Sequence, residues 1–243
     1  MEVQSKAVKF SSAHRSRASE IMDDFDLKGD EMKELLTDLK LVNKWLGGTK
    51  VTIEGLQFLL KQQPKQSTIT ILDVGCGDGE MLRNCARFGR KKGYDFKLIG
   101  IDANNHILTE AKVRSEAFEN ISFQTLDVME IDKSTIEYDI VLCTLFLHHF
   151  PKEQIVVILN KLLKNAKVGC VINDLHRSRL AFVLFKLFSK VVLKTKIARH
   201  DGLVSVARGF KRNELKEISE EITNTVSLVK WKFAFRYMWI LKK

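Results

Sequence analysis

Short runs of apolar residues recur along the middle of the chain, and longer stretches of mixed polarity separate them. Runs rich in Ile, Val and Leu are typical of strands that are buried on both faces of a parallel sheet. The intervening stretches are long enough for crossover helices, so the pattern predicts an α/β fold. The expected parallel strands cover 69–74, 97–102, 121–128, 138–145 and 167–175, and two closing strands cover 226–231 and 233–241.

Helical periodicity marks the segments on either side of this alternation. Apolar residues repeat at intervals of three and four over 31–46, and a second helix is expected over 52–61. Beyond the fifth strand, 180–194 is apolar on nearly every side except for one edge that carries lysines. The segment is too short and too charged to span a membrane. We expect it to form a lid helix that is buried on one side and covers the acceptor pocket. A last helix is expected to start at Asn213.

The first expected strand runs into a glycine-rich turn. Gly75, Gly77 and Gly79 occupy alternate positions, where the missing side chains permit unusual backbone angles and the close approach of a ligand. The spacing differs from the Gly-x-Gly-x-x-Gly of dinucleotide enzymes, and Asp73 lies where those folds usually hold an apolar residue. The turn therefore predicts a nucleoside cofactor site other than a nicotinamide site.

This pattern resembles motif I of class I S-adenosylmethionine-dependent methyltransferases. Asp102 ends the second expected strand 23 residues beyond Gly79, where a carboxylate can accept both ribose hydroxyls. The resemblance implies that Asp127 accepts the adenine amino group and that the end of the fourth strand lies beside the methyl group. Asp73 is expected to hold the amides of the glycine loop and to lie near the amino group of the cofactor. The residues expected to bind S-adenosylmethionine are Asp73, Gly75, Cys76, Gly77, Asp102, Ala103, Asp127, Val128 and Thr144.

The resemblance also implies a Rossmann-like, seven-stranded, mostly parallel sheet whose last strand is antiparallel. We expect one domain, because an apolar content of 45% is ample for a core and no Gly/Ser-rich linker interrupts the chain. The polar stretch 11–17 offers a basic group for the carboxylate of the cofactor. The single domain, 1–243, is expected to comprise an N-terminal helical cap (1–66), a cofactor-binding core (67–175), a lid and acceptor region (176–212) and a closing helix and strands (213–243).

The residues that follow the fourth strand bear on the atom that is methylated. Methyltransferases that act on amino groups of adenine, glutamine or cytosine carry an Asn/Asp-Pro-Pro-aromatic loop there, which this chain lacks over 144–151. Methyl transfer depends chiefly on positioning the acceptor, and a hydroxyl acceptor is helped by a base that titrates near neutrality. His149 is the first candidate for that base, and His148, His176, His200 or a mechanism without a protein base are the alternatives.

The segment after the fifth strand suggests the class of acceptor. Its Asn-Asp-Leu-His-Arg stretch at 173–177, the apolar lid and the Arg-His-Asp-Gly stretch at 199–202 look like those of small-molecule methyltransferases in bacterial polyketide and phenolic-lipid pathways. That resemblance implies a hydrophobic phenolic or polyketide-like acceptor that is methylated on oxygen or, less favourably, on carbon. The residues expected to contact the acceptor are Arg177, Phe182, Arg199 and His200.

The net charge of +10 comes from the C-terminal part of the chain. Residues 176–243 hold 16 Lys and Arg against 5 Asp and Glu, whereas residues 1–175 hold 24 against 25. A basic region favours an anionic partner, which makes RNA methylation an alternative, but no recognisable RNA-binding module accompanies it and a nucleic-acid partner is not expected. A further alternative is an interaction subunit that binds cofactor without catalysis. The segment 180–194 leaves open a peripheral membrane or dimer contact.

The cysteines and the chain start bear on the compartment. Cys76, Cys85, Cys143 and Cys170 lack metal-ligand spacing and are expected to be reduced, buried fillers, so no metal site is expected. The first residues lack the apolar stretch of a secretory signal. The expected location is the cytoplasm.

Overall fold

The computed structural model describes residues 8–23 and 29–243, and it confirms the expected Rossmann-like α/β fold. Seven strands form one sheet in the order β3-β2-β1-β4-β5-β7-β6. The pairs among β1 to β5 are parallel, whereas β7 is antiparallel to both of its neighbours. The strands are β1 (Ile69–Val74), β2 (Phe96–Asp102), β3 (Ile121–Thr125), β4 (Ile140–Thr144), β5 (Gly169–Leu175), β6 (Val226–Lys232) and β7 (Arg236–Lys242).

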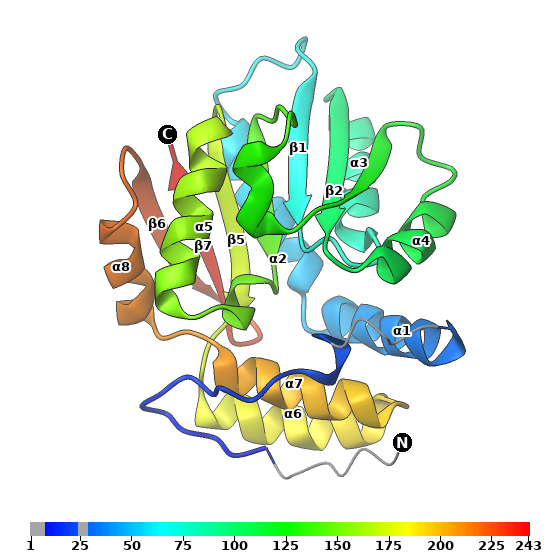
Figure 1. The fold of residues 1–243 in the computed structure, drawn as a ribbon, viewed down its shortest axis with the longest axis vertical. Helices are drawn as coiled ribbons and strands as arrows, with labels where there is room; N and C mark the ends of the chain where they lie inside the picture. Colours follow the sequence, from blue (N-terminus) through cyan, green and yellow to red (C-terminus); the bar gives the residue numbers. More distant parts are fainter. Residues whose placement is uncertain (1–7, 24–28) are drawn as a thin grey trace.

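Helices cover both faces of the sheet (Figure 1). α2 and α3 build the apolar core on one face, and α5 and α8 build the core on the other. α6 and α7 pack together below the carboxyl ends of the parallel strands, and α1 contacts α7 there (Figure 1). The helices are α1 (Gly29–Trp45), α2 (Gly48–Leu60), α3 (Glu80–Lys92), α4 (Asn105–Arg114), α5 (Lys152–Asn165), α6 (Arg179–Val192), α7 (Lys196–Arg208) and α8 (Arg212–Glu220), with 3-10 turns η1 (Ile21–Asp23), η2 (Val128–Lys133) and η3 (Leu147–His149).

Burial explains why the central strands have continuous apolar sequences. Every residue of β4 and β5 is buried except the last one of each strand, so both faces demand apolar side chains. The edge strands β3 and β6 are largely exposed and carry polar residues among the apolar ones. The four cysteines are free and buried.

Two helix starts differ from the sequence-based expectation. α2 begins at Gly48 and not at 52, directly after the turn that ends α1. α8 is capped at Lys211 and not at Asn213, because the Lys211 amide donates to Oε2 of Glu214 at 2.7 Å in a capping box. The acidic side chain three residues inside the helix therefore outweighs the capping preference of Asn213.

The N-terminal region is only partly the helical cap that was expected. The segment before η1 has no helix over 8–20 and runs along α7, where the Ser16 amide donates to the Ala207 carbonyl at 3.0 Å. The amides of Ile21 and Met22 donate to the Asp201 carboxylate at 2.8 and 2.9 Å. These contacts hold the segment against α7. The helices within the region expected to form the cap are α1 and α2, and α2 belongs to the core on one face of the sheet.

The segment expected to form the lid contains two helices, α6 and α7. α6 confirms the helix expected over 180–194, but the Arg-His-Asp-Gly stretch lies inside α7 and not at a turn. Gly202 is used there for packing, since a Cβ on it would lie 2.2 Å from Cζ of Phe185. No helix in the described part of the chain is long and apolar enough to cross a membrane.

Candidate active site

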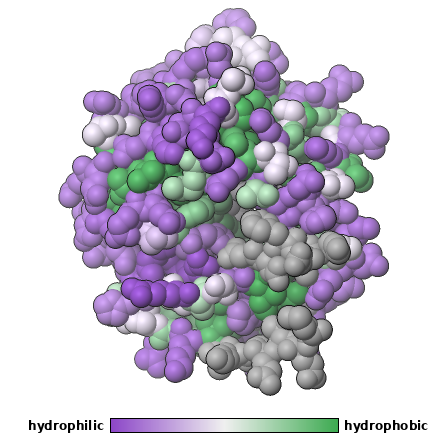
Figure 2. All heavy atoms as spheres, in the orientation of Figure 1, coloured by the Kyte–Doolittle hydropathy of each residue, from purple (hydrophilic) through white to green (hydrophobic). Residues whose placement is uncertain are grey.

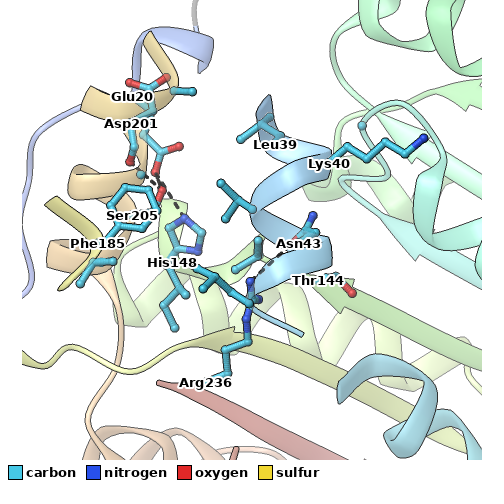
Figure 3. Close-up of a pocket in the computed structure, with 18 of the residues that line it drawn as sticks. Glu20, Leu39, Lys40, Asn43, Thr144, His148, Phe185, Asp201, Ser205 and Arg236 are labelled. Atoms are coloured by element: carbon cyan, nitrogen blue, oxygen red, sulfur yellow. Dashed lines mark hydrogen bonds and ion pairs between the residues drawn. The ribbon is translucent and has the colours of Figure 1, made fainter. Parts of the chain in front are cut away.

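A cavity of about 390 Å³ is lined by residues at the carboxyl ends of the parallel strands and by residues of α1, α6 and α7. The glycine loop, Gly75 to Gly77, lines one end, and Phe185 and Phe188 of α6 line the other. Figure 3 shows Glu20, Asp201 and His148 on one side and Lys40 and Asn43 of α1 on the other. The volume is in the range of small-molecule sites, and the position at strand ends is where open α/β sheets bind ligands.

The glycine loop is held by backbone contacts with the end of β2. The amides of Gly75 and Cys76 donate to the Ile101 carbonyl at 2.9 and 3.1 Å, and the Gly77 amide donates to Oδ2 of Asp102 at 3.0 Å. Asp73 therefore does not hold these amides, which corrects the expectation. The loop is fixed by the neighbouring strand because β1 and β2 are paired along their full length.

Two of the loop glycines are needed for different reasons. Both have positive φ, +65° at Gly75 and +53° at Gly77, which favours glycine. A Cβ on Gly75 would lie 2.2 Å from Cδ2 of Phe146, whereas a Cβ on Gly77 would meet no atom within 4 Å. Gly75 is thus required by packing, and Gly77 borders open space in the cavity, where a ligand can lie on the backbone.

The two acids of this region have unusual environments. Burial, together with the nearby Asp102 charge, raises the pKa of Asp73 to about 8. Burial also raises the pKa of Asp102, although hydrogen bonds from backbone amides, including those of Asn104 and Gly77, oppose that shift. A cationic group near Asp73 would restore its ionised form, and Asp102 remains half-buried at the end of β2, able to accept hydroxyl groups.

The remaining predicted cofactor residues divide into two groups. Thr144 lines the cavity, and its hydroxyl lies 3.0 Å from that of Thr52. Ala103 and Asp127 are exposed outside the lining of the cavity, at the ends of β2 and β3, and the Asp127 carboxylate accepts the Met129 amide at 2.9 Å. Val128 is buried beside them.

A chain of ionisable side chains forms the opposite wall of the cavity. Nδ1 of His148 lies 2.7 Å from Oδ1 of Asp174, and its Nε2 lies 3.3 Å from Oε1 of Glu20. Burial disfavours the imidazolium, but the carboxylates of Asp174 and Glu20 outweigh it and raise the pKa of His148 to about 9. Ser205 donates to Glu20 at 2.7 Å (Figure 3). This buried group holds a proton at neutral pH.

His149 is the more accessible member of the pair. Its side chain is 20% exposed, against 2% for His148, and its Nε2 lies 3.9 Å from Oε2 of Glu20. Glu20, His148 and His149 place ligand atoms within 4.8 Å of one another, where the sequence predicted no metal site, but a divalent cation could bind this donor set only if His148 lost the proton that its two carboxylates favour. Both histidines line the cavity and therefore stay candidates for a catalytic role.

His176 and Arg236 complete the polar lining. Nε1 of Trp231 donates to Nδ1 of His176 at 3.3 Å, which leaves the proton of a neutral ring on Nε2. Burial and the charges of Lys211 and Arg177 lower the pKa of His176. Burial, opposed by the charge of Asp174, lowers the pKa of Arg236 to about 10, and its guanidinium donates to the side-chain amide oxygens of Asn43 and Asn173 at 3.3 and 3.5 Å.

The four residues expected to contact the acceptor do not line the cavity. Arg177 is buried and pairs with Glu214 of α8 at 2.7 Å, and its backbone amide donates to the carbonyl of Phe210, just before α8, at 2.9 Å. The other three side chains have partners outside the lining of the cavity. Phe182 stacks on Phe10 with 5.1 Å between ring centroids, Arg199 donates to the Leu193 carbonyl, and Nδ1 of His200 lies 2.9 Å from Asp201.

The basic group expected from the polar stretch 11–17 is also absent from the cavity lining. Arg15 donates to the carbonyls of Arg208 and His148 at 2.7 and 2.8 Å and stacks over Phe210. It thereby fastens the N-terminal segment instead of binding a ligand. The residues that sequence reasoning missed are Glu20 and Arg236, which lie in segments without a motif, and Asn43, which reads as an ordinary helix residue.

Comparison with known proteins identifies the domain and the fold. Residues 71–169 match the family model of a methyltransferase domain. An uncharacterized protein of Rickettsia prowazekii is 30% identical over 106 residues, a match that spans 41% of this chain and 40% of the relative. The chain therefore aligns with less than half of that relative.

Two solved structures share the fold at low sequence identity. Magnesium protoporphyrin IX methyltransferase of Synechocystis PCC 6803, with SAH bound, is 18% identical with a TM-score of 0.55, covering 83% of this chain and 87% of that one. The plantazolicin methyltransferase BpumL, also in complex with SAH, is 15% identical with a TM-score of 0.64, covering 87% and 93%. Residues 71–169 are thus a match to a methyltransferase domain, and the chain as a whole has the fold of these S-adenosylhomocysteine-bound methyltransferases.

Proposed function

We propose that the protein transfers a methyl group from S-adenosylmethionine to an oxygen of a hydrophobic small molecule, of phenolic or polyketide-like chemistry. The observation that carries this proposal is the single cavity that joins the glycine loop to the wall of Glu20, His148 and His149. Between these ends the lining is largely apolar, with Leu36, Leu39 and Val42 of α1 and Leu184, Phe185 and Phe188 of α6. A carbon acceptor is the less favoured variant.

The residues at the ends of β1 and β2 fit the cofactor. Gly77 lines the cavity and a Cβ on it would meet no atom within 4 Å, which supports a ligand lying on the loop, and Asp102 offers a half-buried carboxylate for the ribose hydroxyls. We expect Asp73 to face the amino group, and Ala103, Asp127 and Val128 to surround the adenine. When bound, S-adenosylmethionine supplies an electrophilic methyl group. The protein contributes mainly the alignment of the acceptor with that group.

His149 is the best candidate for the base that accepts the hydroxyl proton. It is partly exposed to the cavity, and the Glu20 carboxylate beside it can stabilise the imidazolium that forms. His148 is a positioning residue, since both of its ring nitrogens lie within 3.3 Å of a carboxylate. His176 offers its Nε2 proton, so it can donate a hydrogen bond to the acceptor oxygen but cannot be the base at that atom.

The test uses methyl-labelled S-adenosylmethionine and a crude cell extract divided into organic-soluble, RNA and protein fractions. We expect the label in a low-molecular-weight product of the organic fraction, as a methyl ether or ester that hydriodic acid releases. Label that survives this treatment would show a carbon acceptor, and label in RNA would favour the alternative of RNA methylation. The label should also transfer in the presence of a chelator, and it should be lost with His149→Ala.

Absence of label from all fractions would contradict the proposal and favour an interaction subunit. Arg199→Ala is the matched control, because this side chain donates to the Leu193 carbonyl outside the lining of the cavity. That variant should transfer the label normally.

A further inference from the structure

One face of α6 is apolar and exposed to solvent. α6 buries Ala181, Phe185 and Ser189, yet its large apolar side chains on another face are 46 to 87% exposed. Their spacing of three and four residues places them along one line of the helix. We define the lid stripe as Leu180, Val183, Leu184, Leu187 and Val191.

Within the described part of the N-terminal segment, residues 8–23, no side chain is recorded packing on this stripe. The Phe10 ring of that segment packs on Phe182, which lies on a different side of α6 from the stripe. Figure 2 shows apolar atoms at the surface over the lower helices, among hydrophilic neighbours. Monomeric soluble proteins seldom expose a contiguous row of this kind, so the stripe indicates a binding surface.

The stripe continues into the mouth of the cavity. Leu184 belongs to the stripe and also lines the cavity, and Phe233, in the turn between β6 and β7, is 75% exposed and lines it as well. Trp231, beside this turn, is half-exposed and contacts the lining residue His176. Exposed apolar groups therefore flank the opening from both the lid and the hairpin.

Charge identifies the occupant of this surface. Between Asp174 and Asp201 the chain has seven Lys and Arg and no acidic residue. Lys186 and Lys190 are exposed on α6 along one flank of the stripe. Two copies of this chain meeting through the stripe would bring these like charges together, whereas an anionic bilayer offers both opposite charge and an apolar interior.

We propose that the lid stripe docks the protein on an anionic lipid membrane, with the mouth of the cavity at the bilayer surface. Together with the proposed function, which this step rests on, docking implies that the acceptor is a lipid-like molecule that resides in the membrane. Such an acceptor passes from the bilayer into the apolar cavity past Leu184 and Phe233 without crossing water. The docking itself requires neither cofactor nor acceptor.

Vesicle binding of the full chain tests the docking directly. Flotation with vesicles of equal parts phosphatidylcholine and phosphatidylglycerol is compared with vesicles of phosphatidylcholine alone. We expect binding to the anionic vesicles, weakened by high salt, and much weaker binding to the neutral ones. Equal binding to both would overturn the role of charge, and no binding to either would overturn the proposal.

Substitutions on the stripe supply the second arm. The triple variant Leu180→Ser, Leu187→Ser and Val191→Ser changes exposed side chains outside the cavity lining. We expect it to bind anionic vesicles at least about a hundredfold more weakly, since each buried apolar side chain contributes roughly tenfold or more. The matched control replaces three exposed valines on other surfaces and should bind normally; these are Val113→Ser, Val157→Ser and Val226→Ser.

Charge variants supply the third arm. Lys186→Gln and Lys190→Gln should each weaken binding to anionic vesicles about fivefold. Lys91→Gln and Lys164→Gln, which are exposed on α3 and α5, should not. If sedimentation instead shows a dimer that the triple stripe variant dissociates, the stripe is a contact between copies and the proposal fails. Normal vesicle binding without methyl transfer would contradict only the proposed function.

Discussion

The glycine loop makes a quantitative prediction that separates packing from cofactor binding. Gly75→Ala and Gly77→Ala both force an alanine into positive φ, which costs about 1–2 kcal/mol of folding free energy. Reduced freedom of the unfolded chain offsets this by about 0.4–1 kcal/mol. The two variants differ in the space available to the new methyl group, which collides with Phe146 only at Gly75.

We expect Gly75→Ala to lose about 2–4 kcal/mol of unfolding free energy, because overpacking adds about 1–3 kcal/mol to the backbone strain. Gly77→Ala should lose only about 1 kcal/mol. Its new methyl group occupies space in the cavity, so its affinity for S-adenosylmethionine should fall at least about tenfold. Urea unfolding measures the first quantity and calorimetric titration measures the second.

Gly93→Ala is the matched control for this pair. Gly93 also has positive φ, +72°, with no atom within 4 Å of a built Cβ, but it caps the far end of α3. Its stability loss should equal that of Gly77→Ala while its cofactor affinity stays at the wild-type value. Normal affinity in Gly77→Ala would refute the argument that the cofactor lies on the loop.

Three further predictions concern the strand ends, the buried histidine and the lid. Asp102→Ala should weaken cofactor binding at least about tenfold in calorimetric titration, since it removes two charge-assisted hydrogen bonds of roughly 1.5–3 kcal/mol each; unchanged affinity would exclude the ribose contact. The pKa of His148 is raised in the folded protein, so protonation of this side chain stabilises the fold fully below its ordinary pKa of 6.5. That stabilisation is lost as the pH rises through about 9, and the melting temperature should fall between these two pH values. Glu20→Gln should shift this decline to lower pH, and identical melting profiles would contradict the coupling. Phe185→Ala should reduce methyl transfer with cofactor affinity nearly intact, whereas Phe182→Ala, outside the cavity, should not; equal losses in both variants would show a structural effect of the lid.

The cofactor end of the site could be predicted from the sequence because its residues are local to the strands. Apolar runs locate β1 and β2, and the residues that follow a parallel strand must lie at one edge of the sheet. Gly77 and Asp102 were therefore both expected at the cofactor end of the sheet, and the structure joins them by one hydrogen bond of 3.0 Å. The hydrogen-bond partners of the loop amides could not be predicted, because they depend on the register between strands.

The acceptor end could not be predicted in the same way. Glu20 lies in a segment without periodicity, and only tertiary contacts with Asp201 and Ser205 of α7 bring it to His148. Arg177 was expected to contact the acceptor because it closely follows β5, but Glu214 of α8 supplies it with a carboxylate partner. Long-range pairing of charges decides which polar side chains face a cavity, and the sequence carries no local signal for it.

A crystal structure of the protein with S-adenosylhomocysteine would test the central claim most directly. The account predicts the ligand on the glycine loop at Gly77, with its ribose hydroxyls on Asp102 and its sulfur in the cavity facing His149. Adenine should lie between Ala103 and Asp127. A ligand bound elsewhere, or one whose sulfur is separated from His149 by protein, would contradict the proposed route of methyl transfer.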